Sequence, residues 1–183
     1  MNKLLPFFLG LILITISCGE DRTTEFTLRH DGENESAPLL DPDIYEAAAR
    51  FPASVTSDFT GLNLTEVSYY VAATPLQTSL KIYEGGTTNV PGQVIYEAQL
   101  TGNITQNTFN THVLSQPIEM TGADLWISIR FRLNRQLQTI GCDPGPAVTD
   151  GDWLYQESDG QWIPLSQRTA ININWNIRGI LVE

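Results

Sequence analysis

The chain has 183 residues, a formal net charge of −11 and only two cysteines. A surface this acidic repels a phosphate backbone and anionic lipid headgroups. Nucleic acid is therefore excluded as a partner, and membrane attachment would have to rest on acyl chains. About 165 residues follow an N-terminal targeting segment, which is enough for one domain whose core needs no disulfide.

The first 17 residues have the pattern of a secretory signal peptide. Lys3 is followed by an almost wholly apolar run, Leu4 to Ile16, which is too short to cross a bilayer as a helix. Thr15-Ile-Ser-Cys18 resembles the lipobox of bacterial lipoproteins, with Thr where Leu is commonest. This resemblance implies that residues 1–17 are removed and that Cys18 carries the acyl chains. The alternative is an ordinary cleaved signal peptide with an incidental cysteine.

Residues 18–43 are rich in acids and poor in apolar side chains, which predicts a flexible tether. Glu20 and Asp21 directly follow Cys18 and resemble the signals that send Bacteroidetes lipoproteins to the outer face of the outer membrane. A plain solvated spacer is the alternative. With Cys18 acylated, Cys142 is the one remaining thiol, so no intrachain disulfide is possible and we expect Cys142 to be buried.

Residues 44–183 are predicted to form the folded domain. Asp43 to Arg50 favours a short helical turn, because Asp43 can cap it and three alanines follow. The rest of the domain alternates apolar and polar residues between turn signals. The predicted strands are 65–71, 79–83, 94–100, 108–114, 125–133, 153–155, 161–165 and 170–179. This pattern predicts an all-β domain, an antiparallel sandwich.

The last predicted strand has two contrasting faces. Ile171, Ile173, Trp175 and Ile177 alternate with three asparagines and an arginine, Asn172, Asn174, Asn176 and Arg178. Successive side chains of a strand point to opposite faces, so the apolar set is expected in the core, together with Trp162. The polar set, beside aromatic residues such as Trp126, Trp153 and Tyr70, is a candidate sugar-binding face. The alternatives are a solvated face and an internal pairing of Arg178 with an acid such as Asp143.

The carboxyl-terminal third resembles a known family. Gly141-Cys-Asp-Pro-Gly-Pro-Ala147, Gly151-Asp-Trp153, Asp159-Gly-Gln-Trp162 and Asn174-Trp-Asn-Ile-Arg-Gly179 are similar to the jelly-roll modules typified by gingipain cleaved-adhesin domains of secreted Bacteroidetes proteins. The resemblance extends over roughly Tyr45 to Val182. It implies a jelly-roll-like β-sandwich that serves adhesion or binding outside the cell.

Catalytic and metal sites have weaker signals. Only His30 and His112 are available to activate a nucleophile such as Cys142. The acids Glu66, Glu84, Glu97 and Glu119 show no pattern of a glycosidase pair. Three aspartates near a Gly/Pro-rich loop, Asp143, Asp150 and Asp152, could bind calcium, although each could equally belong to a turn.

The sequence therefore predicts a lipid-anchored module of the outer membrane, displayed at the cell surface and without catalytic activity. Its partner would be a glycan or an extracellular protein, and calcium is the one cofactor that the residues suggest. A structural accessory subunit of a surface complex and a carbohydrate-active enzyme are the alternative functions.

Overall fold

The structure is a computed structural model that describes residues 24–183. The predicted signal peptide (1–17) and the predicted lipidation site, Cys18, lie outside the described residues, as do Glu20 and Asp21. Within residues 24–183, no helix combines the length and the apolar character needed to cross a membrane.

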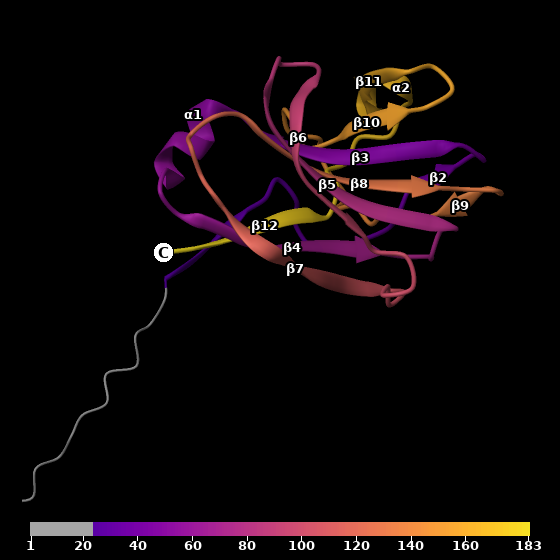
Figure 1. The fold of residues 1–183 in the computed structure, drawn as a ribbon. Coiled ribbons are helices and arrows are strands. Elements are labelled where there is room, and N and C mark those ends of the chain that lie inside the picture. The colour runs from indigo at the N-terminus through magenta and orange to yellow at the C-terminus, as the bar shows by residue number, and fades with distance from the viewer. Residues whose placement is uncertain (1–23) are drawn as a thin grey trace, which may run out of the picture.

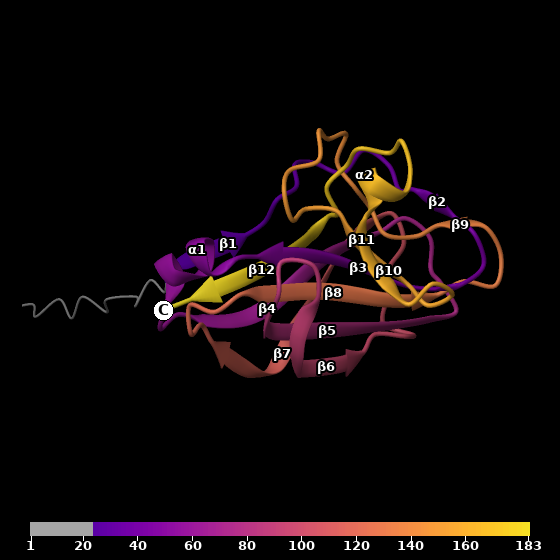
Figure 2. The same ribbon diagram turned by 90° about the horizontal axis from the view of Figure 1, so that it is seen from above.

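Two antiparallel sheets pack face to face (Figures 1 and 2). The four-stranded sheet contains, in spatial order, β1 (Glu25–Leu28), β12 (Ile177–Val182), β4 (Asn63–Val71) and β7 (Thr108–Glu119). The six-stranded sheet contains β11 (Gln161–Pro164), β10 (Trp153–Gln156), β3 (Ile44–Phe51), β8 (Leu125–Arg132), β5 (Gln77–Gly86) and β6 (Pro91–Gln99). The remaining elements are the β2–β9 pair (Leu39–Leu40 and Leu137–Gln138) and the helical turns α1 (Ala53–Thr56), η1 (Ser57–Phe59) and α2 (Leu165–Arg168).

The order of the strands is that of a jelly roll. Apart from the β2–β9 and β10–β11 pairs, eight strands remain, and they divide into the sheets β1-β12-β4-β7 and β3-β8-β5-β6. In chain order, the first, third, sixth and eighth strands therefore form one sheet, and the other four form the facing sheet. Two four-stranded sheets filled in this order form the double Greek key of a jelly roll. The predicted all-β, antiparallel, jelly-roll-like sandwich is confirmed.

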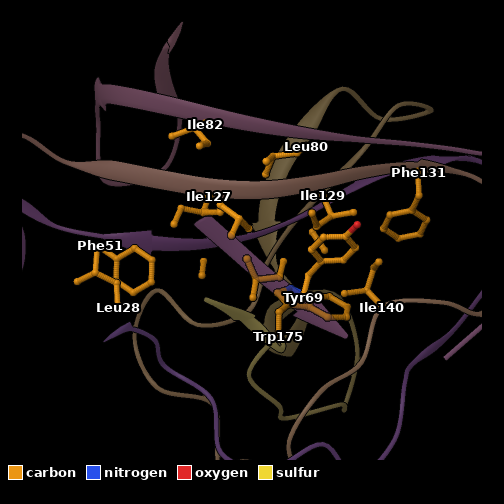
Figure 3. Close-up of a cluster of buried hydrophobic side chains, with 14 of the residues drawn as sticks. Leu28, Phe51, Tyr69, Leu80, Ile82, Ile127, Ile129, Phe131, Ile140 and Trp175 are labelled. Atoms are coloured by element: carbon orange, nitrogen blue, oxygen red, sulfur yellow. The ribbon is translucent and has the colours of Figure 1, made fainter. Parts of the chain in front are cut away.

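The main core lies between the two sheets (Figure 3). Alternate residues of β8, among them Ile127, Ile129 and Phe131, point into it from one side, and Tyr69 of β4 meets them from the other. Trp175, just before β12, is also fully buried there, as its predicted apolar face requires. A Cβ atom at position 179 would lie 2.8 Å from Ile127 Cδ1 and 2.9 Å from Leu64 Cδ1, so these two side chains pack closely against β12 at Gly179.

A second, smaller apolar cluster lies on the face of the six-stranded sheet that is turned away from the core, called the outer face below. It contains Ala48, Tyr83, Trp126 and Trp153, with Trp162 packed against it. The Trp126 ring centroid is 5.2 Å from that of Trp153 and 5.6 Å from that of Trp162. The outer face is therefore covered by aromatic rings near β10 and β11.

The predicted helical turn at Asp43 to Arg50 is wrong, because Ile44–Phe51 forms strand β3. This strand lies between β10 and β8, and both of its faces are covered. Ala47 and Ala49 pack in the main core, while Ala48 packs under the tryptophans of the outer face. The alanines that favour a helix locally are here the small residues that a doubly covered strand accommodates.

The predicted flexible tether at residues 18–43 is also wrong from Glu25 onward. Glu25–Leu28 pairs with β12, with Phe26 opposite Leu181 and Leu28 opposite Gly179. Leu28 is buried in the main core. Strand β1 is thus the first strand of the jelly roll, and it places the start of the described chain beside the C-terminus (Figures 1 and 2).

Candidate ligand-binding site

The polar side chains of the predicted terminal strand do not form a surface. Strand β12 begins only at Ile177, and Asn174 and Asn176 are 2% and 0% exposed. Of the four predicted residues, Asn172 is exposed, and its Oδ1 accepts a hydrogen bond from the backbone amide of Ala147. The prediction of a sugar-binding amide face is therefore wrong, because neighbouring loops cover this side of the chain.

Asn174 is bound to the loop that carries Asp143. Its Nδ2 donates to Asp143 Oδ2 at 3.0 Å and to the carbonyl of Pro146 at 3.1 Å, and its Oδ1 accepts from the amide of Val148 at 2.8 Å. Asp143 Oδ1 accepts from the backbone amide of Asn174 at 2.8 Å. Every polar atom of the Asn174 amide is thus used inside the protein.

Asn176 and Arg178 are bound to the segment that precedes β2. Asn176 Nδ2 donates to Asp31 Oδ2 at 2.6 Å, and Arg178 Nε donates to the same oxygen at 2.9 Å. The Arg178 guanidinium also lies 4.3 Å from the centroid of the Phe109 ring. Arg178 is paired internally, as one alternative predicted, but with Asp31 in place of Asp143. Asp31, Asp143, Asn174, Asn176 and Arg178 are called the interior polar network below.

Asp143 is held in its charged form by this network. Burial raises the pKa of its carboxyl, but hydrogen bonds from Asn174 and from the amides of Gly32 and Gly145 outweigh burial, so the pKa lies below its usual value. The stabilisation by Asp143 is therefore present above the pKa of the unfolded carboxyl, about 3.9, and is lost as the pH falls through the folded pKa.

We expect Asp143→Asn to lower the free energy of unfolding more at neutral pH than in acid, because the stabilisation by the charged carboxyl declines once the pH falls below the pKa of the unfolded carboxyl. Urea unfolding at neutral pH and at about pH 3 measures the difference. Asp58→Asn, at an exposed position, is the matched control and should change little at either pH. An equal loss from Asp143→Asn at both pH values would contradict the assignment.

The three aspartates of the predicted calcium site are used separately. Asp143 belongs to the interior polar network, Asp150 pairs with Arg50 at 2.9 Å, and Asp152 accepts from the amide of Ser166 at 2.8 Å. Among residues 24–183, no group of three or more His, Cys, Asp or Glu is arranged to hold a metal ion. The predicted ligand set Asp143, Asp150 and Asp152 is therefore wrong, since each carboxylate already binds its own partner.

The two tryptophans predicted as binding residues lie in the outer aromatic cluster. Trp126 is fully buried, and Trp153 is 6% exposed, with its Nε1 donating to Asp150 Oδ1 at 3.1 Å. Trp126 is therefore no contact for a ligand, whereas Trp153 lines two surface pockets. The half-buried Trp162, which the sequence pattern assigned to the core, lines the second of them.

These two pockets have volumes of about 430 Å³ and about 290 Å³. Both are lined by Trp153, Pro164, Asn89 and Gln167, so they form one continuous depression, called the tryptophan pocket below. Asn89 comes from the turn between β5 and β6, and Gln167 comes from α2. Their exposed amide side chains thus lie at the depression that Trp153 and Trp162 also line.

The larger part of the tryptophan pocket is lined by Arg50, which forms ion pairs with two aspartates. Arg50, which is 7% exposed, donates from Nη1 to Asp150 and from Nη2 to Asp124, at 2.9 Å and 2.6 Å. Burial lowers the pKa of Arg50, but its hydrogen bonds to Asp150 and Asp124 outweigh burial and raise the pKa. The guanidinium therefore stays charged, and it holds the end of β3 to the loop that carries Asp150.

The residues weighed for catalysis bond to other groups or are distributed over several strands. Cys142 is buried, with its Sγ 3.4 Å from Ser36 Oγ, and burial raises the pKa of its thiol. His112 Nε2 bonds to the Tyr96 hydroxyl at 2.8 Å, and His30 Nε2 donates to the Arg50 carbonyl at 2.6 Å. The four acids considered for a glycosidase pair, Glu66, Glu84, Glu97 and Glu119, lie on four different strands.

No family model matches the sequence, and no curated protein matches it. Among solved structures, the chain is similar to the clostridial cysteine protease Cwp84 after propeptide cleavage, with a TM-score of 0.62, 11% identity, 86% of this chain covered and 40% of that chain. The Gt strain of infectious bursal disease virus gives a TM-score of 0.35 at 16% identity, covering 97% of this chain and 39% of that chain. The chain thus spans about two fifths of the structures it matches.

The prediction that the chain is without catalytic activity is corrected by this comparison, because a domain of similar fold forms part of the Cwp84 protease chain. At 11% identity the likeness shows the fold alone, namely a β-sandwich domain.

Proposed function

We propose that the chain is a bacterial surface lipoprotein, anchored by acyl chains on Cys18 in the outer membrane, whose jelly-roll domain binds a glycan. The lipobox-like Thr15-Ile-Ser-Cys18 supports the anchor. The similarity of the Gly141 to Gly179 motifs to gingipain-type cleaved-adhesin modules supports a role in recognition outside the cell.

The observation that carries the glycan assignment is the lining of the tryptophan pocket. Sugar rings present apolar C–H faces, which stack on aromatic rings, and hydroxyls, which bond to planar amides. The pocket combines Trp153 and Trp162 with Asn89 and Gln167 at its rim. The same pairing of amides with aromatics was predicted for the terminal strand. In this proposal the pairing is made instead by the β5–β6 turn, β10, β11 and α2.

The first test is a screen of the full-length chain, purified in detergent, on an array of neutral and acidic glycans. We expect Trp162→Ala to weaken binding of any selected glycan by about tenfold or more, since an aromatic contact contributes roughly 1.5–3 kcal/mol. Asn89→Ala and Gln167→Ala should each weaken binding by about three- to tenfold, the loss of one hydrogen bond.

Gln161→Ala is the matched control, because Gln161 is exposed on the same strand pair but does not line the pocket. A thermal melt of each variant separates lost binding from lost folding, which matters for Trp162 because it packs against Trp126. If no glycan is bound, or if Gln167→Ala and Gln161→Ala behave alike, the pocket is not a glycan site.

A further inference from the structure

A second surface pocket, of about 400 Å³, lies at the other end of the six-stranded sheet from the tryptophan pocket, where β3 and β5 begin. It is lined by the ends of three strands: Gln77 opens β5, Gln99 ends β6 and Arg132 ends β8. Lys81 and Arg130 line it from the same strands. In Figure 1 this end of β8 is the one opposite to the C-terminus. The pocket therefore lies away from the end at which the described chain begins.

This pocket brings together three of the ten basic residues of an acidic chain. The whole chain has 10 Lys and Arg against 21 Asp and Glu, yet Lys81, Arg130 and Arg132 all line this one pocket, with Glu97 as the acid among its lining residues. Within residues 24–183, Arg132 forms no salt bridge, and its side chain is exposed. Lys81, Arg130 and Arg132 are called the cationic pocket below.

A buried carboxylate, Glu46, lies next to two residues of the cationic pocket, Lys81 and Arg130. Glu46 is 2% exposed, and its Oε1 accepts hydrogen bonds from the Tyr83 hydroxyl and the Ser128 hydroxyl, each at 2.6 Å. Burial raises the pKa of Tyr83, and the adjacent Glu46 raises it further, so the phenol keeps the proton that it donates. The other oxygen, Oε2, lies 3.8 Å from Lys81 Nζ and 3.7 Å from Arg130 Nη1.

Those two distances exceed the range of a hydrogen bond, so Glu46 attracts both cations without using their N–H donors. Arg130 Nη2 is bound by the exposed Glu157, whereas Lys81 and Arg132 have donors available to a ligand. An anionic group with two or three oxygens would receive charge-assisted hydrogen bonds there, about twice as strong as neutral ones.

Lys81 of the cationic pocket lies in one cross-strand row with Trp153 of the tryptophan pocket, and Arg132 lies four residues along β8 from that row. Trp153 pairs with Ala48, Ala48 with Ser128, and Ser128 with Lys81, so one cross-strand row joins the two pockets. The row covers three strand spacings of about 4.8 Å, or about 14 Å in total. An extended oligosaccharide of about three or four sugar residues has that length, and one end of it would reach Lys81. From Ser128 to Arg132 the strand runs about 13 Å, so a ligand that bends toward this end of β8 would also reach the Arg132 guanidinium.

We propose that the cationic pocket binds the carboxylate or sulfate group of an acidic glycan whose other residues occupy the tryptophan pocket. This inference rests on the proposed glycan-binding function and names the class of glycan.

Calorimetric titration of the full-length chain in detergent tests the proposal with four probes. An oligogalacturonate carries carboxylates only, and its methyl ester is neutral; a carrageenan oligosaccharide carries sulfates only, and its desulfated form is neutral. We expect one of the charged probes to bind about tenfold or more tightly than its neutral form, with a preference that declines as salt is raised to about 0.5 M. Which charged probe binds distinguishes a uronic acid from a sulfated sugar.

We further expect Arg132→Gln to remove most of that tenfold preference while leaving the affinity for the neutral form unchanged. Arg135→Gln is the matched control, because it makes the same change of charge at an exposed arginine outside the pocket. Neither arginine forms a salt bridge within residues 24–183, so neither variant should alter the thermal melt.

The outcomes separate the two proposals. Equal affinity for charged and neutral probes, both weakened by Gln167→Ala, would overturn the acidic-glycan proposal and leave glycan binding standing. A charged probe whose binding depends on Arg132 but not on Trp162 or Gln167 would support the cationic pocket and overturn the role of the tryptophan pocket. Equal effects of Arg132→Gln and Arg135→Gln would overturn the cationic pocket. No binding of any of the four probes would overturn the acidic-glycan proposal, and no binding of any glycan on the array as well would overturn both proposals.

Discussion

A chain that begins at residue 44 is expected not to form the folded domain, whereas a chain that begins at residue 24 is expected to fold. The deleted segment contains β1, which pairs along β12, and it contributes Leu28 to the main core. It also supplies Asp31, the acceptor for Asn176 and Arg178. Breaking a buried charge pair by removing one partner costs about 3–5 kcal/mol, a large part of the roughly 5–15 kcal/mol that stabilises a domain.

Urea unfolding of the two chains, followed by near-ultraviolet circular dichroism, measures this effect. The shorter chain should show no cooperative transition. A milder variant of the full chain isolates the buried charge: Asp31→Asn should lower the free energy of unfolding, whereas the exposed Glu33→Gln should not. A cooperative transition at the same urea concentration in both chains would show that β1 is dispensable.

The strand pattern of the sandwich could be predicted because one face of most strands meets the core. On β8, Leu125, Ile127, Ile129 and Phe131 are buried as the alternation requires. The alternation does not say what covers the other face. Trp126 and Ser128 point the opposite way and are also fully buried, because β10 and β11 extend the sheet and their aromatic rings cover it. Burial on both faces also explains why β3 contains three alanines. Their high helix propensity is the reason that the sequence suggested a helix.

The candidate site was harder to predict, because its residues come together only through the topology. Asn89 and Gln167 are separated by 78 positions in the chain, and neither belongs to a recognisable motif. The interior polar network was missed for a related reason. Asp31 lies in a segment whose acidic composition predicts a flexible tether, and its burial depends on Arg178, 147 residues away. A buried acid and an exposed acid have the same appearance in a sequence.

The three asparagines of the terminal segment look equivalent in the sequence, and the structure predicts that they are not. Asn174→Ala should lower the free energy of unfolding by about 2–4 kcal/mol, because it leaves the buried Asp143 with fewer donors and the amide of Val148 without its acceptor. The change is measured by urea unfolding at neutral pH, with the slope of the transition checked for two-state behaviour.

Asn172→Ala is the matched control, since it makes the same substitution two residues earlier at an exposed position. It removes one hydrogen bond, to the amide of Ala147, and should cost about 1 kcal/mol or less because water can replace the lost acceptor. If both substitutions were equally mild, the interior polar network would contribute little to stability, and the amide side chains would again be candidates for a surface role. A large loss at Asn174 alone would instead assign these amides to holding the loop of Asp143 against the terminal segment, which leaves ligand recognition to the outer face.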